Sequence, residues 1–147
     1  MRDDDSVLYV EKKESPHSMR ICTRIGQKLP LYCTATGKAI LAYLSDEEVR
    51  STLNRMELIQ FTSKTRTDIQ AIMDELETIR HQGYAFDLEE LEYGLVCVAV
   101  PLLNKVNRPV GGISVSGPAV RMTKTFRLHT ADLLLDVSKK IRRQMGH

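Results

Sequence analysis

Hydrophobic and polar residues alternate near the start of the chain. From Val7 to Lys12 successive side chains fall on opposite faces, and Glu14-Ser-Pro16 ends the run. Residues 18–24 repeat the alternation. The two runs predict a β-hairpin.

Three helices are predicted after Pro30. Residues 36–44 are rich in helix formers, and residues 45–48 (Ser-Asp-Glu-Glu) match a capping box that starts a second short helix. A third helix begins at the capping-box pattern of residues 67–70 (Thr-Asp-Ile-Gln) and ends at Gly83, with apolar residues at helical spacing between them.

Three strands and a long helix are predicted in the last part of the chain. The strands are residues 84–88, 95–101 and 110–116, and the middle one is apolar on both faces, as in the centre of a covered sheet. From Thr123 onward apolar residues recur on one helical face. The order β-β-α-α-α-β-β-β-α predicts a single domain of the α+β class.

Composition and charge exclude several classes of protein. With 147 residues, 42% of them hydrophobic and 27% charged, the chain matches one globular domain. A net charge of +2 is too small for polyanion binding by the whole surface. There is no apolar run of about 18 residues and no signal-peptide pattern. Three widely spaced cysteines indicate a reducing compartment, so we expect a cytoplasmic protein: Cys22, Cys33 and Cys97.

Motifs of catalysis and metal binding fail at defining positions. A phosphate loop ending at Lys38 would need glycine in place of Tyr32 and a hydroxyl residue in place of Ala39. A nucleophile elbow around Ser114 would need glycine in place of Ser116. The sequence therefore predicts no enzyme, metal or cofactor. The histidines are isolated, without metal-ligand spacing: His17, His81, His129 and His147.

Small polar residues on neighbouring strands form a candidate binding face. Ser114 and Ser116 are two residues apart and share one face, and Cys97 lies on the preceding strand. Asp87 is near the end of the strand before that, where an ionised carboxylate would accept from a ligand hydroxyl. The alternative is that the serines are small residues admitted for packing beside two glycines and that Asp87 forms a turn.

A second candidate patch opens the first predicted helix. Residues 33–37 (Cys-Thr-Ala-Thr-Gly) form a turn of small residues whose free backbone N–H groups can hold a carboxylate. The alternative is ordinary N-capping by Thr34 or Thr36.

These segments resemble the C-terminal effector domain of the IclR family of bacterial transcription factors. The first is residues 29–40, LPLYCTATGKAI. The second block, in the same order and spacing as the family signature, is GYAFD at 83–87, GLVCVAVP at 94–101 and VGGISVSGP at 110–118. The resemblance extends over residues 7–141.

The resemblance implies a GAF/profilin-like fold in which helices flank an antiparallel β-sheet, with a small-metabolite pocket on one face. It implies that backbone N–H groups of Ala35 and Thr36 hold a ligand carboxylate. Further effector-binding positions implied by the family comprise four polar residues and three apolar wall residues: Asp87, Cys97, Ser114, Ser116, Ile21, Leu29 and Leu95.

The resemblance also implies a function. Residues 1–147 would be the effector-binding domain of a regulator that senses a small organic acid and forms a homodimer or homotetramer. The winged helix-turn-helix domain that precedes this domain in the family has no counterpart in these residues, so we expect DNA contact only through that missing domain. Two alternatives remain: a small enzyme acting on a keto or hydroxy acid through Cys97 or Asp87, and a dimerisation module with an empty pocket.

Overall fold

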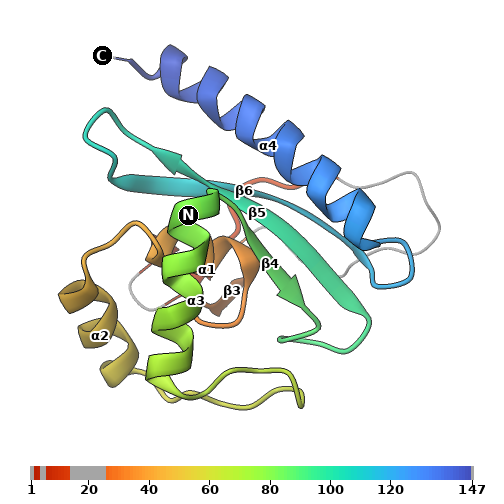
Figure 1. Ribbon diagram of the computed structural model, residues 1–147. Coiled ribbons are helices and arrows are strands. Elements are labelled where there is room, and N and C mark those ends of the chain that lie inside the picture. Colours follow the sequence, from red (N-terminus) through yellow and green to blue (C-terminus); the bar gives the residue numbers. More distant parts are fainter. Residues whose placement is uncertain (1, 4–5, 14–25, 147) are drawn as a thin grey trace.

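The computed structural model describes residues 2–3, 6–13 and 26–146, which contain two antiparallel three-stranded sheets (Figure 1). The first sheet has the order β1-β2-β3, with bounds Arg2–Asp3, Ser6–Leu8 and Lys28–Pro30. The second has the order β4-β5-β6, with bounds Ala85–Leu88, Leu95–Leu103 and Pro109–Pro118.

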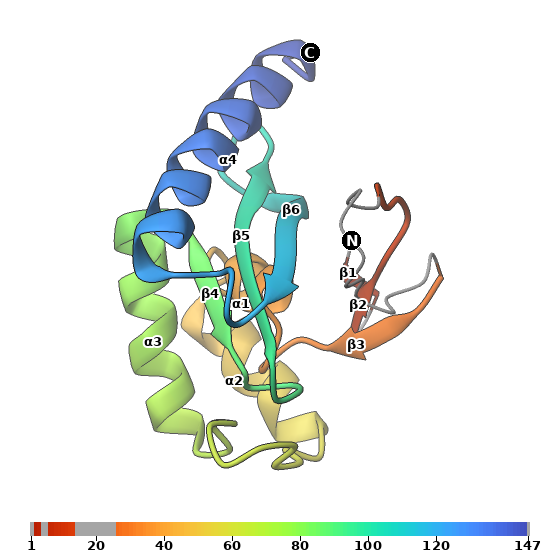
Figure 2. The same cartoon turned by 90° about the vertical axis from the view of Figure 1, so that its right-hand side faces the viewer.

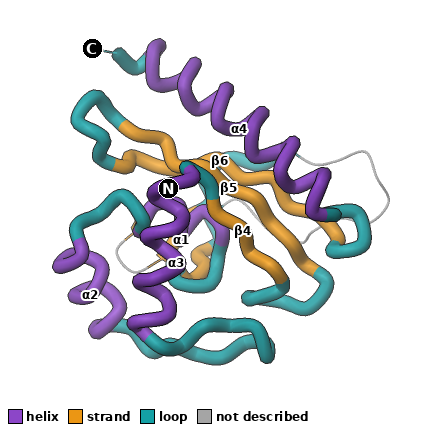
Figure 3. Tube along the Cα trace, in the orientation of Figure 1, coloured by secondary structure: helices purple, strands orange, loops and turns teal. Residues whose placement is uncertain are grey.

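Helices cover both faces of the second sheet. In Figures 1 and 3, α4 crosses one face and α1 lies against the other, with α3 beside α1. This arrangement confirms the α+β prediction of an antiparallel sheet flanked by helices. The helix bounds are α1 Ala35–Leu41, α2 Asp46–Arg55, α3 Ile69–Gln82 and α4 Lys124–Gln144.

Strand β5 is the central strand of its sheet and is buried on both faces, as its sequence predicts. Val96, Val98 and Val100 pack on the side of α4, in one cluster with Leu134. Cys97 and Ala99 face the other way, into the cluster built on α1. The sheet thus divides the apolar interior into two layers.

The helix termini follow the capping patterns with one correction. Ser45 and Glu48 form the predicted capping box of α2, and Gly83 ends α3 with a left-handed φ of 89°. The box predicted to begin at Thr67 is wrong by one residue. Asp68 caps α3 because its carboxylate accepts from the Ala71 N–H at 2.9 Å.

The first strand of the predicted hairpin is described only in part: β2 covers Ser6–Leu8, and no strand is assigned to residues 9–13. β2 pairs with β1 and also with β3, where Val7 lies opposite Leu29. The predicted second strand, residues 18–24, lies outside the described residues, as does Ile21. In Figure 2 this small sheet stands on the opposite side of β6 from α4.

Helix α4 is long but strongly charged along its length. None of the helices in the described ranges is long and apolar enough to cross a membrane.

Candidate functional site

A cavity of about 360 Å³ lies between the start of α1, one face of the β4-β5-β6 sheet and the segment around β3. Ile21, in the undescribed segment, is not placed. The other eight residues predicted for the site all line this cavity: Leu29, Ala35, Thr36, Asp87, Leu95, Cys97, Ser114 and Ser116.

The strand register aligns the polar side chains across the sheet. Asp87 pairs with Cys97, and Cys97 pairs with Ser116, so the three lie in one row across β4, β5 and β6. The Ser116 hydroxyl donates to Cys97 Sγ at 3.1 Å. Ser116 is exposed and Ser114 half-buried, so close packing does not account for Ser116.

Close packing requires a residue without a Cβ atom at Gly112. A Cβ atom added there would lie 2.8 Å from Thr36 Cγ2 and 3.2 Å from the Val100 carbonyl oxygen. The glycine therefore lets the start of α1 approach β6, and this approach forms one end of the cavity.

Asp87 is buried, with 1% of its surface exposed. Its Oδ1 accepts from the Glu90 N–H at 2.8 Å, so one carboxyl oxygen of Asp87 stabilises a turn, as the alternative interpretation predicted. Burial raises the pKa of Asp87 to about 7, against the lowering effect of the Glu90 N–H and Lys38. Near neutral pH the carboxyl group is therefore partly protonated and can donate as well as accept. This corrects the expectation of a carboxylate that only accepts.

The thiols beside the cavity are poor nucleophiles. Burial, followed by the neighbouring Asp87, raises the pKa of Cys97 to about 12, and the same two causes raise the pKa of Cys33 to about 12. A thiol must lose its proton to act as a nucleophile. No group of three His, Cys, Asp or Glu residues within the described segments could hold a metal ion.

The start of α1 supplies backbone donors. Thr34 is the N-cap: its hydroxyl oxygen accepts from the Gly37 N–H at 3.2 Å and donates to the Pro30 carbonyl at 2.7 Å. The capping alternative is thus correct for Thr34. It leaves the N–H groups of Ala35 and Thr36, which have no acceptor within the helix and belong to residues that line the cavity.

Sequence reasoning missed several residues that also line the cavity: Tyr9, Gln27, Pro118 and the segment 91–94. Burial raises the pKa of Tyr9 to about 12, with contributions from nearby Cys97 and Asp87. The alternating pattern placed Tyr9 on a strand face. No neighbouring residue in the sequence indicated that Tyr9 would line the same cavity as residues of β5.

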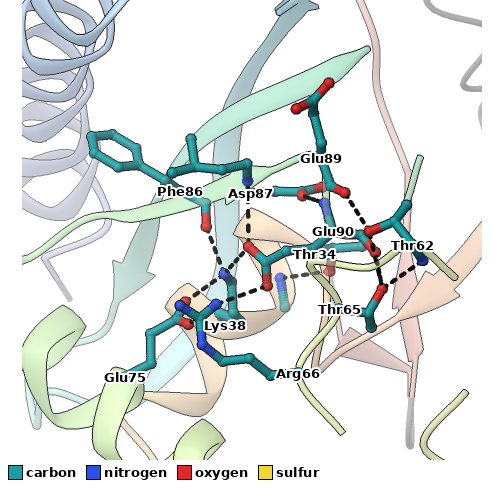
Figure 4. Close-up of polar contacts among 12 residues, drawn as sticks. Thr34, Lys38, Thr62, Thr65, Arg66, Glu75, Phe86, Asp87, Glu89 and Glu90 are labelled. Atoms are coloured by element: carbon teal, nitrogen blue, oxygen red, sulfur yellow. Dashed lines mark hydrogen bonds and ion pairs between the residues drawn. The ribbon is translucent and has the colours of Figure 1, made fainter. Parts of the chain in front are cut away.

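Lys38 was also missed, because the sequence pointed to it only through the failed phosphate loop. The side chain is buried, and its Nζ lies 2.5 Å from Glu75 Oε1 and 2.6 Å from Glu90 Oε2 (Figure 4). The signal available in the sequence was a single lysine in a predicted helix whose following residues are mostly apolar.

Comparison with known proteins identifies relatives over the whole described fold. A family model described as "Bacterial transcriptional regulator IclR C-terminal" matches residues 1–143. The transcriptional regulator KdgR of Escherichia coli K12 is 37% identical over 145 residues, which are 99% of this chain and 55% of KdgR. The repressor AllR of the same strain is 32% identical, with 99% of this chain and 54% of AllR covered. The chain thus spans about half the length of these relatives.

Solved structures agree with this match. The IclR protein of Thermotoga maritima superposes with a TM-score of 0.94 at 37% identity, covering 99% of this chain and 59% of that chain. The inducer-binding domain of PobR from Acinetobacter was solved as a double mutant in complex with 3-hydroxybenzoic acid. It superposes with a TM-score of 0.86 at 25% identity, and the match covers 96% of this chain and 83% of the PobR chain.

Proposed function

The chain belongs to the IclR family of bacterial transcriptional regulators and forms the family's C-terminal domain, and from this premise we propose that it senses a small organic acid. The acid would bind in the cavity beside α1, and occupancy would bias a DNA-binding domain of the full-length regulator, acting in the cytoplasm. DNA contact is assigned to that other domain because this one carries only a small net charge.

The observation that carries this proposal is the convergence of donors and acceptors on one cavity. About 360 Å³ is within the usual size range of small-molecule sites. Backbone N–H groups approach from α1, while hydroxyl and carboxyl groups approach from the sheet. The PobR domain, which shares this fold, is known in complex with an aromatic hydroxy acid.

We assign the ligand carboxylate to the N–H groups of Ala35 and Thr36. The second polar group of the ligand would bond to Asp87, Ser114 or Ser116, beside Cys97. Leu29 and Leu95 would form the apolar wall, and Ile21 is retained as a proposed wall position. The partly protonated Asp87 favours ligands with a keto or hydroxyl oxygen, because it can donate to the first and accept from the second.

The test is ligand-induced thermal stabilisation with pyruvate, gluconate and 3-hydroxybenzoate as probes. A ligand at 100 times its Kd adds about 2.7 kcal/mol to the free energy of unfolding, which corresponds to several degrees in Tm. The double variant Ser114→Ala/Ser116→Ala is expected to lose most of this gain, since each unpaired polar group of the ligand costs about 1 to 3 kcal/mol. Asp87→Ala is expected to do the same.

A matched control replaces an exposed serine on α2 that does not line the cavity, Ser51→Ala, and should keep the full stabilisation. If the cavity variants also keep it for every probe that stabilises the parent protein, the assignment of the site is wrong. Conversion of a probe during incubation, followed by NMR, would instead favour the enzyme alternative.

Self-association is the second part of the proposal. Phe126, Leu133 and Val137 lie on one side of α4 and are 46%, 53% and 41% exposed. An apolar stripe of this kind is suited to contact with a second copy. We expect sedimentation at tens of micromolar to give a dimer or larger assembly. A single species near 16.7 kDa would contradict this part alone.

A further inference from the structure

We propose that Lys38 and Glu90, an ion pair buried behind the cavity, position Asp87 and set its charge, and so decide how well the cavity accepts an anion at a given pH. The consequence for ligand binding rests on the proposed function above. The effect on Asp87 itself does not, and the two can be measured separately.

Lys38 reaches the cavity wall from behind. Its side chain is 2% exposed, and its Nζ donates to Glu75 Oε1 at 2.5 Å and to Glu90 Oε2 at 2.6 Å. A third bond at 2.6 Å goes to the carbonyl oxygen of Phe86, the residue directly before Asp87 (Figure 4). Burial opposes the charged form, yet the two carboxylates raise the pKa of Lys38 above its ordinary value.

Glu90 connects the ion pair to Asp87. Its backbone N–H donates to Asp87 Oδ1 at 2.8 Å, and its own Oε2 accepts from the Leu88 N–H at 3.3 Å. Glu89, between these residues, has a left-handed φ of 60°. The carboxylate of Glu90 and the ammonium of Lys38 thus hold backbone groups on both sides of Asp87, so the turn that fixes its side chain depends on the pair.

The charges of this cluster are balanced without Asp87. Lys38 and Arg66 supply two cations and Glu75 and Glu90 two carboxyl groups, with Arg66 Nη1 2.6 Å from Glu75 Oε2. Burial raises the pKa of Glu90, while the charge of Lys38 and its hydrogen bond oppose this and favour the carboxylate. Ionisation of Asp87 adds a negative charge in a buried region where no cation is left over. Burial raises the pKa of Asp87, the charge of Glu90 raises it further, and the charge of Lys38 lowers it.

The phenol and the two thiols that lie near Asp87 stay neutral through this pH range. Burial raises the pKa of each to about 12: Tyr9, Cys33 and Cys97. Glu92 is a further carboxyl group that lines the cavity. Asp87 is therefore the buried group of the cavity wall that changes charge near pH 7.

Removing the charge of Glu90 and removing the charge of Lys38 should move the titration midpoint of Asp87 in opposite directions. Glu90→Gln removes a negative charge and makes ionisation of Asp87 easier, so its titration midpoint falls. Lys38→Met removes a positive charge, so the midpoint rises. If the pair only supported the fold, both variants would loosen the turn, expose Asp87 and move the midpoint the same way.

The first measurement is a ¹³C NMR titration of the Asp87 carboxyl group in the ligand-free domain. We expect a midpoint near 7 in the parent protein. It should fall by about one pH unit in Glu90→Gln and rise by about one in Lys38→Met. Lys64→Met is the matched control, because it removes a lysine from an exposed ion pair with Glu89 and should leave the midpoint unchanged. Equal midpoints, or shifts in one direction, overturn the proposal.

Lys38→Met leaves two carboxylates without their shared cation, so a second variant guards against failure to fold. Lys38→Met/Glu90→Gln removes both charges and should have a midpoint above that of Glu90→Gln alone. An identical midpoint in these two variants overturns the role of Lys38.

The second measurement is the pH dependence of Kd for pyruvate, gluconate and 3-hydroxybenzoate. Affinity should weaken as the pH rises through the Asp87 midpoint, by up to about tenfold per pH unit, and the onset should move with each variant. If no probe binds at any pH while the NMR midpoints still move in opposite directions, the proposed function fails and the role of the ion pair stands. If the probes bind but the pH at which their affinity begins to weaken is the same in all variants, the proposed effect of the ion pair on anion binding is wrong.

Discussion

Gly37→Ala is expected to lower the free energy of unfolding by at least about 3 kcal/mol, although alanine is the better helix former. A Cβ atom on Gly37 would lie 2.3 Å from the Leu31 carbonyl oxygen, 2.6 Å from Leu31 Cα and 2.6 Å from Thr34 Oγ1. Two of these atoms belong to the backbone, so no side-chain rotation relieves the overlap. The turn that leads into α1 has to move, and the N-cap bond from Gly37 to Thr34 is lost with it.

Urea unfolding measures this loss, and Gly111→Ala is the matched control. A Cβ atom on Gly111 meets only Leu102 Cδ1, at an ordinary 3.9 Å. We expect this control to stay within about 1 kcal/mol of the parent protein. A Gly37→Ala variant that is equally stable would show that the turn before α1 yields easily. Such a turn could not hold the N–H groups of Ala35 and Thr36 in place for a carboxylate.

Elements with strong local signals were predictable from the sequence. α2 and α3 carry side-chain caps and apolar residues at helical spacing, and β5 is apolar on both faces. These signals depend on neighbours within about four residues or on a period of two. α1 begins one residue earlier and ends three residues earlier than predicted. The bonds from Tyr43 N to Ile40 O and from Leu44 N to Leu41 O tighten its last turn.

Features that depend on distant pairing were not predictable in this way. β3 has three residues, and their partners in β2 lie twenty or more positions earlier. Such a strand has too few residues for a periodic pattern. The contacts of Lys38 with Glu75 and Glu90 join residues 37 and 52 positions apart. No local rule distinguishes this buried lysine from a solvated one.

The candidate site was predictable in part for the same reason. Alternation placed Ser114 and Ser116 on one face, and the structure puts them on the cavity side of β6. Only the family resemblance predicted that this face and the start of α1 would line the same site. Tyr9 directly follows β2 of the small sheet, whose position relative to β5 is a tertiary property. The protonation of Asp87 is likewise a consequence of burial, which no sequence motif encodes.

Asp87→Asn is expected to stabilise the ligand-free domain at pH 8 by about 2 to 4 kcal/mol. The pKa of Asp87 is about 7 in the folded chain, against an ordinary value of 3.8. Between these values the folded state binds a proton that the unfolded state has released. The stability contributed by the neutral carboxyl group is therefore complete below about pH 4, falls as the pH rises towards 7, and is lost above it.

Asparagine removes this dependence because it cannot ionise, while its Oδ1 can still accept from the Glu90 N–H. Urea unfolding at pH 5 and pH 8 should show a gain that is larger at pH 8. Asp132→Asn, an exposed position on α4, is the control and should change stability little at either pH. If Asp87→Asn and the parent protein lose stability equally between pH 5 and pH 8, Asp87 is already ionised at pH 5. A cavity carrying that fixed negative charge would select ligands by their hydroxyl groups and bind them with the same affinity across this range.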